Sequence, residues 1–165
     1  MDTMQASTPQ GARAIDRWFA HYSDDHRDAT NQRIHVVAVP LILWSVIALL
    51  WCIPAPGTLF RAGIWAGVAM AAAGAFYVRA SRPLGLGMVA LFVLMGLLTH
   101  VIAAAFGMRA LLVTAIVVFV IAWIAQFVGH KVEGRKPSFL TDLTYLLIGP
   151  AWVLAKLCRR LGLAY

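Results

Sequence analysis

Residues 84–106 read LGLGMVALFVLMGLLTHVIAAAF, and residues 110–130, after Gly107-Met-Arg109, read ALLVTAIVVFVIAWIAQFVGH. Each run matches the roughly 20 apolar residues with which an α-helix crosses the ~30 Å hydrocarbon core of a bilayer. A connection of so few residues favours helices that run antiparallel to each other. The two runs therefore predict an antiparallel helical bundle inside a membrane.

Two further apolar runs precede this pair, at residues 35–54 and 59–78. They end at turn and charge signals, Pro54-Ala-Pro-Gly57 and Arg79-Ala-Ser-Arg82-Pro83. Of the 165 residues 61% are hydrophobic and 13% are charged, whereas soluble domains have about 45–50% and about 25%. This excess of apolar residues excludes an ordinary soluble enzyme and a disordered chain. We expect an all-α polytopic membrane bundle with four transmembrane helices.

The last apolar run, residues 139–157, is a poor candidate for a fifth span. It contains Asp142, and Gly149-Pro150 interrupts it. A carboxylate is costly inside a bilayer, and proline breaks the hydrogen bonding of a helix. We expect a re-entrant or interfacial C-terminal helix here.

Basic residues support four crossings. With four spans, only Arg61 and Arg109 lie on the outer side of the membrane. A fifth span would move Lys156, Arg159 and Arg160 to that side as well and weaken the asymmetry of basic residues. Because basic loops stay in the cytoplasm, we expect both termini on the cytoplasmic side. The other twelve Lys and Arg residues share that side: Arg13, Arg17, Arg27, Arg33, Arg79, Arg82, Lys131, Arg135, Lys136, Lys156, Arg159 and Arg160. They form no patch with interleaved aromatics, which argues against a nucleic-acid partner.

A single domain over residues 1–165 then has three parts: a cytoplasmic segment (1–34), the four spans (35–130) and a C-terminal part (131–165). In the first part, the apolar side chains of residues 11–22 recur at helical spacing. They are Ile15, Trp18, Phe19 and Tyr22. This pattern predicts an amphipathic helix. The helix either lies on the membrane surface or packs on the end of the bundle, and the pattern fits both.

Three of the five histidines are expected to meet at the cytoplasmic face. His35 opens the first span and His130 closes the fourth, so antiparallel helices bring both to the same boundary, and a short tether holds His26 there. His100 lies deep in the third span, near the opposite boundary, and His21 belongs to the amphipathic segment. Neither is expected in the same site.

Polar residues accompany these histidines at helical spacing. Asn31 precedes His35 by four residues, Gln126 precedes His130 by four, and Glu133 follows three later. Residues three or four apart share one helix face. We therefore expect all of them to face the same site.

A helix break must separate His26 from His35, because residues nine apart on one continuous helix point to opposite sides. Asp28 or Thr30 is the candidate cap. Asp142, which follows Pro137-Ser138, has two interpretations. It either complements the dipole at a helix start, which needs no long-range geometry, or orients one imidazole.

Three neutral imidazoles with a nearby carboxylate suit iron, zinc, copper or nickel, and the ligand types alone leave the choice of metal open. The competing interpretation is that the histidines are boundary residues that hydrogen-bond to lipid phosphates or to the backbone. No P-loop, dinucleotide-binding fingerprint or HExxH motif offers other chemistry.

Two separated motifs resemble a small family of multi-pass membrane proteins, the 2-hydroxy-palmitic acid dioxygenase-like proteins. The first, HRDATNQRIH at residues 26–35, continues to Val39-Pro40, and the second runs from QFVGH at residues 126–130 to Lys136-Pro137. The resemblance implies an iron(II)-dependent dioxygenase that shortens 2-hydroxy fatty acids by one carbon. The fungal form has one extra residue in the second motif, which leaves open whether Glu133 is a ligand.

By this resemblance, the family's essential histidines correspond to His26, His35 and His130, which would hold iron(II), and Asn31 matches a family asparagine. Open positions on the iron would take the 2-hydroxy acid and O₂, and no organic cofactor would be needed. Asn31, Gln126 and Asp142 are candidates to orient the imidazoles. The protein would be an integral protein of a bacterial inner membrane, with the metal site on the cytoplasmic side. Two alternatives stay open: a zinc-dependent lipid hydrolase, and a non-enzymatic protein that binds lipid or a partner.

Overall fold

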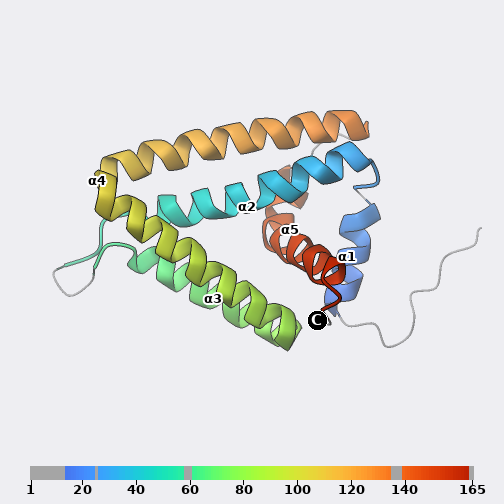
Figure 1. The fold of residues 1–165 in the computed structure, drawn as a ribbon, viewed down its shortest axis with the longest axis horizontal. Coiled ribbons are helices and arrows are strands. Elements are labelled where there is room, and N and C mark those ends of the chain that lie inside the picture. The colour runs from blue at the N-terminus through green and yellow to red at the C-terminus, as the bar shows by residue number, and fades with distance from the viewer. Residues whose placement is uncertain (1–13, 25, 58–60, 135–138, 164–165) are drawn as a thin grey trace, which may run out of the picture.

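Five α-helices form most of the chain in the computed structural model, which describes residues 14–24, 26–57, 61–134 and 139–163, without the side chains of residues 14 and 139–146. The helices are α1 (Ala14–Asp24), α2 (Ala29–Trp51), α3 (Ile64–Ala80), α4 (Arg82–Glu133) and α5 (Phe139–Arg160). Figure 1 shows α2, α3 and α4 as the long part of the molecule, with α1 and α5 gathered at one end. The predicted all-α class is confirmed.

The helix α4 is a hairpin of two arms. It has 52 residues, and Gly107 interrupts the helical backbone with φ 82° and ψ 164°. Glycine adopts such a positive φ without the steric cost that a side chain brings. In Figure 1 the first arm lies beside α3, and the second arm returns beside α2. The two apolar runs around Gly107 thus form the antiparallel pair, although Met108 and Arg109, expected in the connection, are helical.

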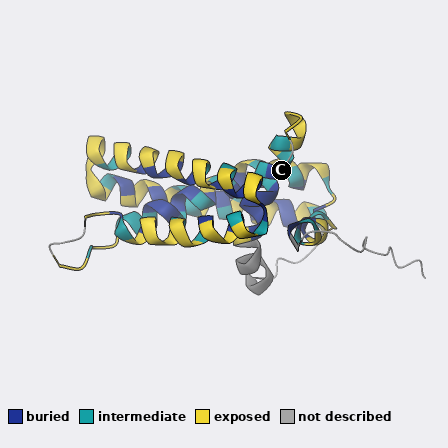
Figure 2. Ribbon diagram, turned by 90° about the horizontal axis from the view of Figure 1, so that it is seen from below, coloured by how far each residue is buried: buried dark blue, intermediate teal, exposed yellow. Residues whose placement is uncertain are grey.

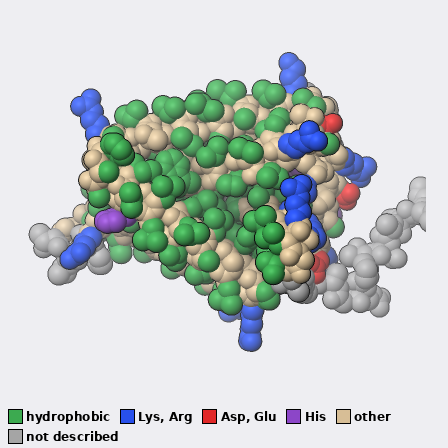
Figure 3. All heavy atoms as spheres, viewed as in Figure 1, with side chains coloured by type: hydrophobic (Ala, Val, Ile, Leu, Met, Phe, Trp, Pro, Cys, Tyr) green, Lys and Arg blue, Asp and Glu red, His purple; other side chains and the backbone are tan. Residues whose placement is uncertain are grey.

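Two of the described helices, α2 and α4, are long and apolar enough to cross a membrane, and the apolar α3 is shorter, with 17 residues. Their outward sides are exposed and their facing sides are buried (Figure 2). Large apolar side chains such as Leu86, Leu94 and Ile121 are at least 60% exposed. Hydrophobic side chains also cover the middle of the face in Figure 3, with charged ones around its margin. Such a continuous apolar surface is suited to lipid rather than water. The number of spans stays a prediction.

The amphipathic helix α1 packs on the end of the bundle. Ile15, Phe19 and Tyr22 are buried in the core cluster that also contains Trp152 of α5. Trp18, on the same side of α1, stacks on Phe76 of α3 with ring centroids 5.6 Å apart. Of the two interpretations of this stripe, the structure therefore favours packing against protein.

The helix α5 runs through Gly149-Pro150, so the predicted interruption is wrong at the level of secondary structure. Both residues are buried, and a Cβ at Gly149 would lie 3.2 Å from the Tyr22 hydroxyl oxygen. The glycine thus lets α1 approach α5 closely. The hydroxyl of Tyr77 on α3 donates to the carbonyl of Leu147 and ties α3 to α5. Whether α5 is re-entrant or interfacial stays a prediction.

Candidate metal centre

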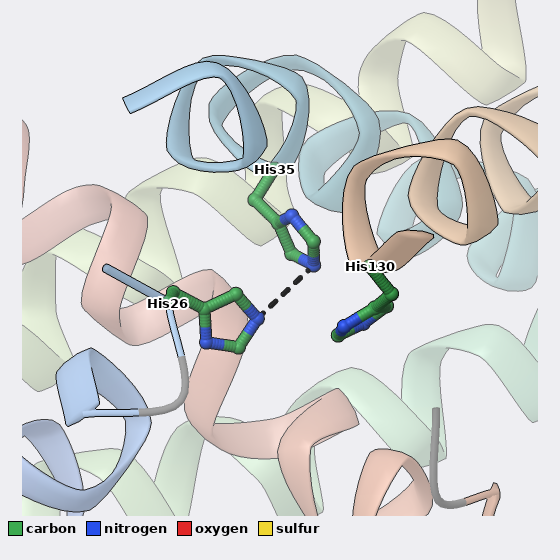
Figure 4. Close-up of side chains that lie close together, drawn as sticks. All are labelled: His26, His35 and His130. Carbon is green, nitrogen blue, oxygen red and sulfur yellow. Dashed lines mark hydrogen bonds between the residues drawn. The ribbon is translucent and has the colours of Figure 1, made fainter. Parts of the chain in front are cut away.

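Three histidines from separate parts of the chain meet at the end of the bundle where α2 begins and α4 ends. His26 lies between α1 and α2, His35 on α2 and His130 on α4, and Figure 4 shows the three rings converging. They are 1%, 1% and 9% exposed. Their nearest nitrogen atoms all lie within 4.8 Å of one another. The predicted convergence of these three side chains is confirmed.

The break that brings His26 to His35 is the start of α2 itself. Asp28 is its N-cap, and its carboxylate accepts hydrogen bonds from the backbone amides of Thr30 and Asn31, at 2.7 and 3.0 Å. Of the two predicted caps, the structure shows Asp28. The helix therefore begins at Ala29 rather than at His35, and His26 stands off its axis and can turn back to His35.

Replacing Asp28 with Ala is expected to destabilise the fold by about 1 kcal/mol, because two amides at the start of α2 lose their acceptor. Unfolding of the detergent-solubilised protein in denaturant measures this change. Thr30→Ala is the matched control, since the exposed Thr30 contributes its backbone amide to the cap rather than its side chain. A larger loss in Thr30→Ala than in Asp28→Ala would contradict the assignment of the cap.

Backbone carbonyls orient two of the rings. His26 Nδ1 lies 2.7 Å from the carbonyl oxygen of Tyr22, and His35 Nδ1 lies 3.0 Å from that of Asn31. A carbonyl only accepts, so each Nδ1 carries the hydrogen, and in a neutral ring Nε2 is left with a lone pair. The carbonyl contacts thus set both rings in the tautomer in which metal-binding histidines commonly occur.

The two Nε2 atoms of His26 and His35 then face each other at 3.2 Å (Figure 4). Two lone pairs repel at this distance. A proton on one ring would relieve the repulsion but would bury a charge, which is costly. A metal ion held by both lone pairs relieves it as well, and His130, whose ring centroid lies 5.0 Å from that of His35, stands beside them as a third donor. The site therefore fits a transition-metal ion.

Glu133 is bound to the loop that carries His26. Its carboxylate accepts from the backbone amides of Arg27 and Asp28, at 2.8 and 3.0 Å, and from Asn31 Nδ2 at 2.9 Å. Among the described residues, the group of converging ligand atoms contains the three histidines and not Glu133. This geometry makes Glu133 an anchor between the end of α4 and the His26 loop.

Replacing Glu133 with Ala is expected to weaken metal binding about 10- to 100-fold, the usual effect of losing a residue that positions ligands. Titration of the metal-free protein with cobalt(II), followed by its absorption spectrum, measures the affinity. Glu133→Gln is the control, because its amide oxygen still accepts from the loop. If Glu133 were itself a ligand, Glu133→Gln and Glu133→Ala would weaken metal binding equally. That result would contradict the anchoring role.

The other predicted polar neighbours have different surroundings. Asn31 is fully buried, and its Oδ1 has no hydrogen-bond partner in the described part of the chain. Gln126 is buried one turn before His130 on α4. Asp142 lies in the first turn of α5, where an acid complements the helix dipole, but its side chain lies outside the described residues.

The remaining two histidines lie apart from this cluster, as predicted. His100 is exposed, and its ring is 6.1 Å from that of Trp51, which ends α2 at the opposite end from His35. His21 is exposed on α1.

Comparison with known proteins identifies the family of this chain. A family model described as 2-hydroxy-palmitic acid dioxygenase Mpo1-like matches residues 12–161. The chain belongs to this family. It is 29% identical over 150 residues to the 2-hydroxy-palmitic acid dioxygenase MPO1 of Saccharomyces cerevisiae, an alignment that covers 86% of this chain and 78% of the yeast protein. No solved structure matches. The family is one of oxidoreductases, and its match extends over all three histidines.

Two aromatic residues of this Mpo1-like protein line the site without having been predicted there. Tyr22 stacks on His26, with ring centroids 4.2 Å apart and planes at 13°. The ring centroid of Trp152 lies 6.3 Å from that of His26. The indole N–H of Trp152 donates to Ser23 Oγ at 2.9 Å. Tyr22 could have been suspected, because its carbonyl is one helical turn before His26. Nothing in the sequence pattern indicates Trp152.

Proposed function

We propose that this protein is an iron(II)-dependent dioxygenase that converts 2-hydroxy fatty acids into fatty acids one carbon shorter, the reaction of fatty acid α-oxidation. The observation that carries the proposal is the buried cluster of His26, His35 and His130 in a chain of the Mpo1-like family. The name of the family refers to 2-hydroxy-palmitic acid, which supports a 2-hydroxy fatty acid as the substrate.

In this proposal the three histidines hold the iron, and the carbonyls of Tyr22 and Asn31 keep His26 and His35 in the binding tautomer. Iron(II) held by these histidines would supply a Lewis acid for the oxygens of a 2-hydroxy acid, together with the redox chemistry that O₂ requires. Glu133 positions the His26 loop, and Asn31 and Gln126 lie one helical turn before His35 and His130 and support these imidazoles. Burial of all three rings keeps bulk water away from the reacting head of the substrate.

The overall reaction balances without a further reductant. A 2-hydroxy acid and O₂ give the shorter acid, carbon dioxide and water, so the bond between the carboxyl carbon and the hydroxyl-bearing carbon breaks. The substrate supplies the electrons that O₂ takes up. No organic cofactor is needed for this balance.

We place the site at a membrane boundary. The four crossings would be α2, α3 and the two arms of α4, an arrangement supported by their exposed apolar side chains and by the turn at Gly107. The histidines lie where α2 begins and α4 ends, so the head of the substrate would meet them at the cytoplasmic face of a bacterial inner membrane. The acyl chain would extend into the lipid layer. The C-terminal α5 would lie at the interface.

The test uses detergent-purified protein loaded anaerobically with iron(II) and mixed with 2-hydroxypalmitic acid and O₂. Mass spectrometry is expected to detect pentadecanoic acid, in amounts that depend on both iron and oxygen. His130→Ala is expected to form none. Absence of product from the iron-loaded wild type would overturn the proposal, as would stoichiometric zinc in the protein as purified combined with no response to oxygen.

A further inference from the structure

A cleft of about 390 Å³ lies between the first turns of α2 and the last turns of α5. It is separate from the three histidines. Its basic side chains are Arg33 from α2 and Lys156 and Arg160 from α5. The remaining lining residues are Ala29, Gln32, Val36 and Val37. The cleft thus combines a basic rim with an apolar wall.

The three basic groups have no acidic partner in the described part of the chain. Asp28, the neighbouring acid in the sequence, directs its carboxylate to the amides of Thr30 and Asn31. Partial burial lowers the pKa of the Lys156 ammonium, and the positive charges of Arg160 and Arg159 lower it further. An anion placed among these groups would offset both the burial and the mutual repulsion.

Lys156 is held in place rather than free in solvent. Its Nζ donates to Gln32 Oε1 at 2.5 Å and lies 4.3 Å from the centroid of the Trp152 ring. Gln32 is fixed in turn, because its Nε2 donates to the backbone carbonyl of His26 at 2.7 Å. The cation is therefore preorganised at the mouth of the cleft, which reduces the entropy that a ligand must lose on binding.

The apolar wall continues along α2 away from the charges. Arg33, Val37 and Leu41 follow one another at four-residue spacing and so lie on one face of the helix. Val37 is 62% exposed and Leu41 is 41% exposed. Because α2 is long and apolar enough to cross a membrane, this face runs from a basic rim into the lipid layer. Its shape and polarity match an amphiphile with one charged end.

We propose that this cleft is a second binding site, which takes the anionic head of a membrane amphiphile, a carboxylate or a phosphate, with its acyl chain along Val37 and Leu41. Arg33 and Arg160 pair with the head group, and Lys156 donates to it from its position on Gln32. The site needs no metal ion and does not depend on turnover at the histidine cluster.

The test measures binding of single-chain probes to the metal-free full chain in a neutral detergent. Radiolabelled palmitate, hexadecyl phosphate and hexadecanol share one chain length and differ in the head, and equilibrium dialysis gives their affinities. We expect palmitate, hexadecyl phosphate or both to bind, and hexadecanol to bind at least about tenfold more weakly. A hydrogen bond between charged groups changes the dissociation constant by about this factor, and hexadecanol cannot form one. The preferred anion identifies the source, a free fatty acid or a phospholipid head.

The double variant R33Q/R160Q is expected to lose this preference, and R79Q/R82Q is the matched control. Both remove two exposed arginines, but Arg79 lies in the last turn of α3 and Arg82 at the start of α4. Lys156→Gln provides a second variant if R33Q/R160Q fails to fold. Equal binding of hexadecanol, wild-type affinity in the cleft variants, or an equal loss in R79Q/R82Q would overturn the proposal. Because the protein is metal-free, these outcomes are independent of whether it is a dioxygenase.

Discussion

Replacement of His35 with Ala is expected to abolish specific metal binding and turnover. His35 is 1% exposed, its Nε2 faces that of His26 at 3.2 Å, and its ring points from α2 toward those of His26 and His130 (Figure 4). Loss of a residue that merely positions a ligand costs about 10- to 100-fold, so loss of a ligand exceeds 100-fold in affinity. Elemental analysis of protein purified without a histidine tag, together with the product assay, measures both effects.

His100→Ala is the control for this variant, because it removes an imidazole of α4 that lies near Trp51, at the end of α2 far from His35. It is expected to keep the metal content and activity of the wild type. Added imidazole should partly restore metal binding in His35→Ala by occupying the space left by the ring. Wild-type metal content in His35→Ala would show that the histidines are boundary residues rather than ligands.

The second large effect is expected for Gly129→Ala, at the crossing of α2 and α4. A Cβ on Gly129 would overlap Oδ1 of Asn31, and Ile34 Cδ1 lies 3.5 Å from the same position. Asn31 cannot move aside without losing its hydrogen bond to Glu133. Overpacking of this kind destabilises a protein by about 1–3 kcal/mol. The backbone carbonyl of Asn31 also orients the His35 ring. We therefore expect the metal affinity to fall together with the free energy of unfolding.

Gly67→Ala provides the matched control on α3, since no atom lies within 4 Å of its Cβ position. There the exchange is expected to be neutral or slightly stabilising, because alanine favours the helix. The double variant N31A/G129A tests the cause. With Oδ1 gone, the alanine at position 129 should add little to the loss that Asn31→Ala produces alone. Additive effects would contradict a clash between these two residues.

The convergence of the histidines could be predicted from the sequence because it depends on topology more than on packing. Apolar runs of membrane-spanning length with short connections place the start of α2 and the end of α4 at one face, whatever the details of their contacts. The break at Asp28 was predictable for a similar reason, since His26 and His35 cannot share a site on one continuous helix. Caps are local interactions, and local interactions leave a pattern in the sequence.

The path of α5 and the role of Glu133 could not be predicted in this way. Proline at position 150 suggested an interruption, yet the helix continues because tertiary packing outweighs the local penalty. Glu133 was a candidate ligand by spacing alone. Its binding to the amides of Arg27 and Asp28 depends on how the His26 loop meets the end of α4.

Sequence alone is enough to predict that this protein is an all-α chain with apolar helices long enough for a membrane, and that three histidines share one end of it. Hydrophobic length and helical period set both properties, and neither requires knowledge of side-chain contacts. The folded chain was needed to show which nitrogen of His26 and His35 faces inward, that Tyr22 and Trp152 cover His26, and that α5 brings Lys156 to α2. These features depend on atoms from helices distant in the sequence meeting within a few ångströms, and such contacts have no period or spacing along the chain.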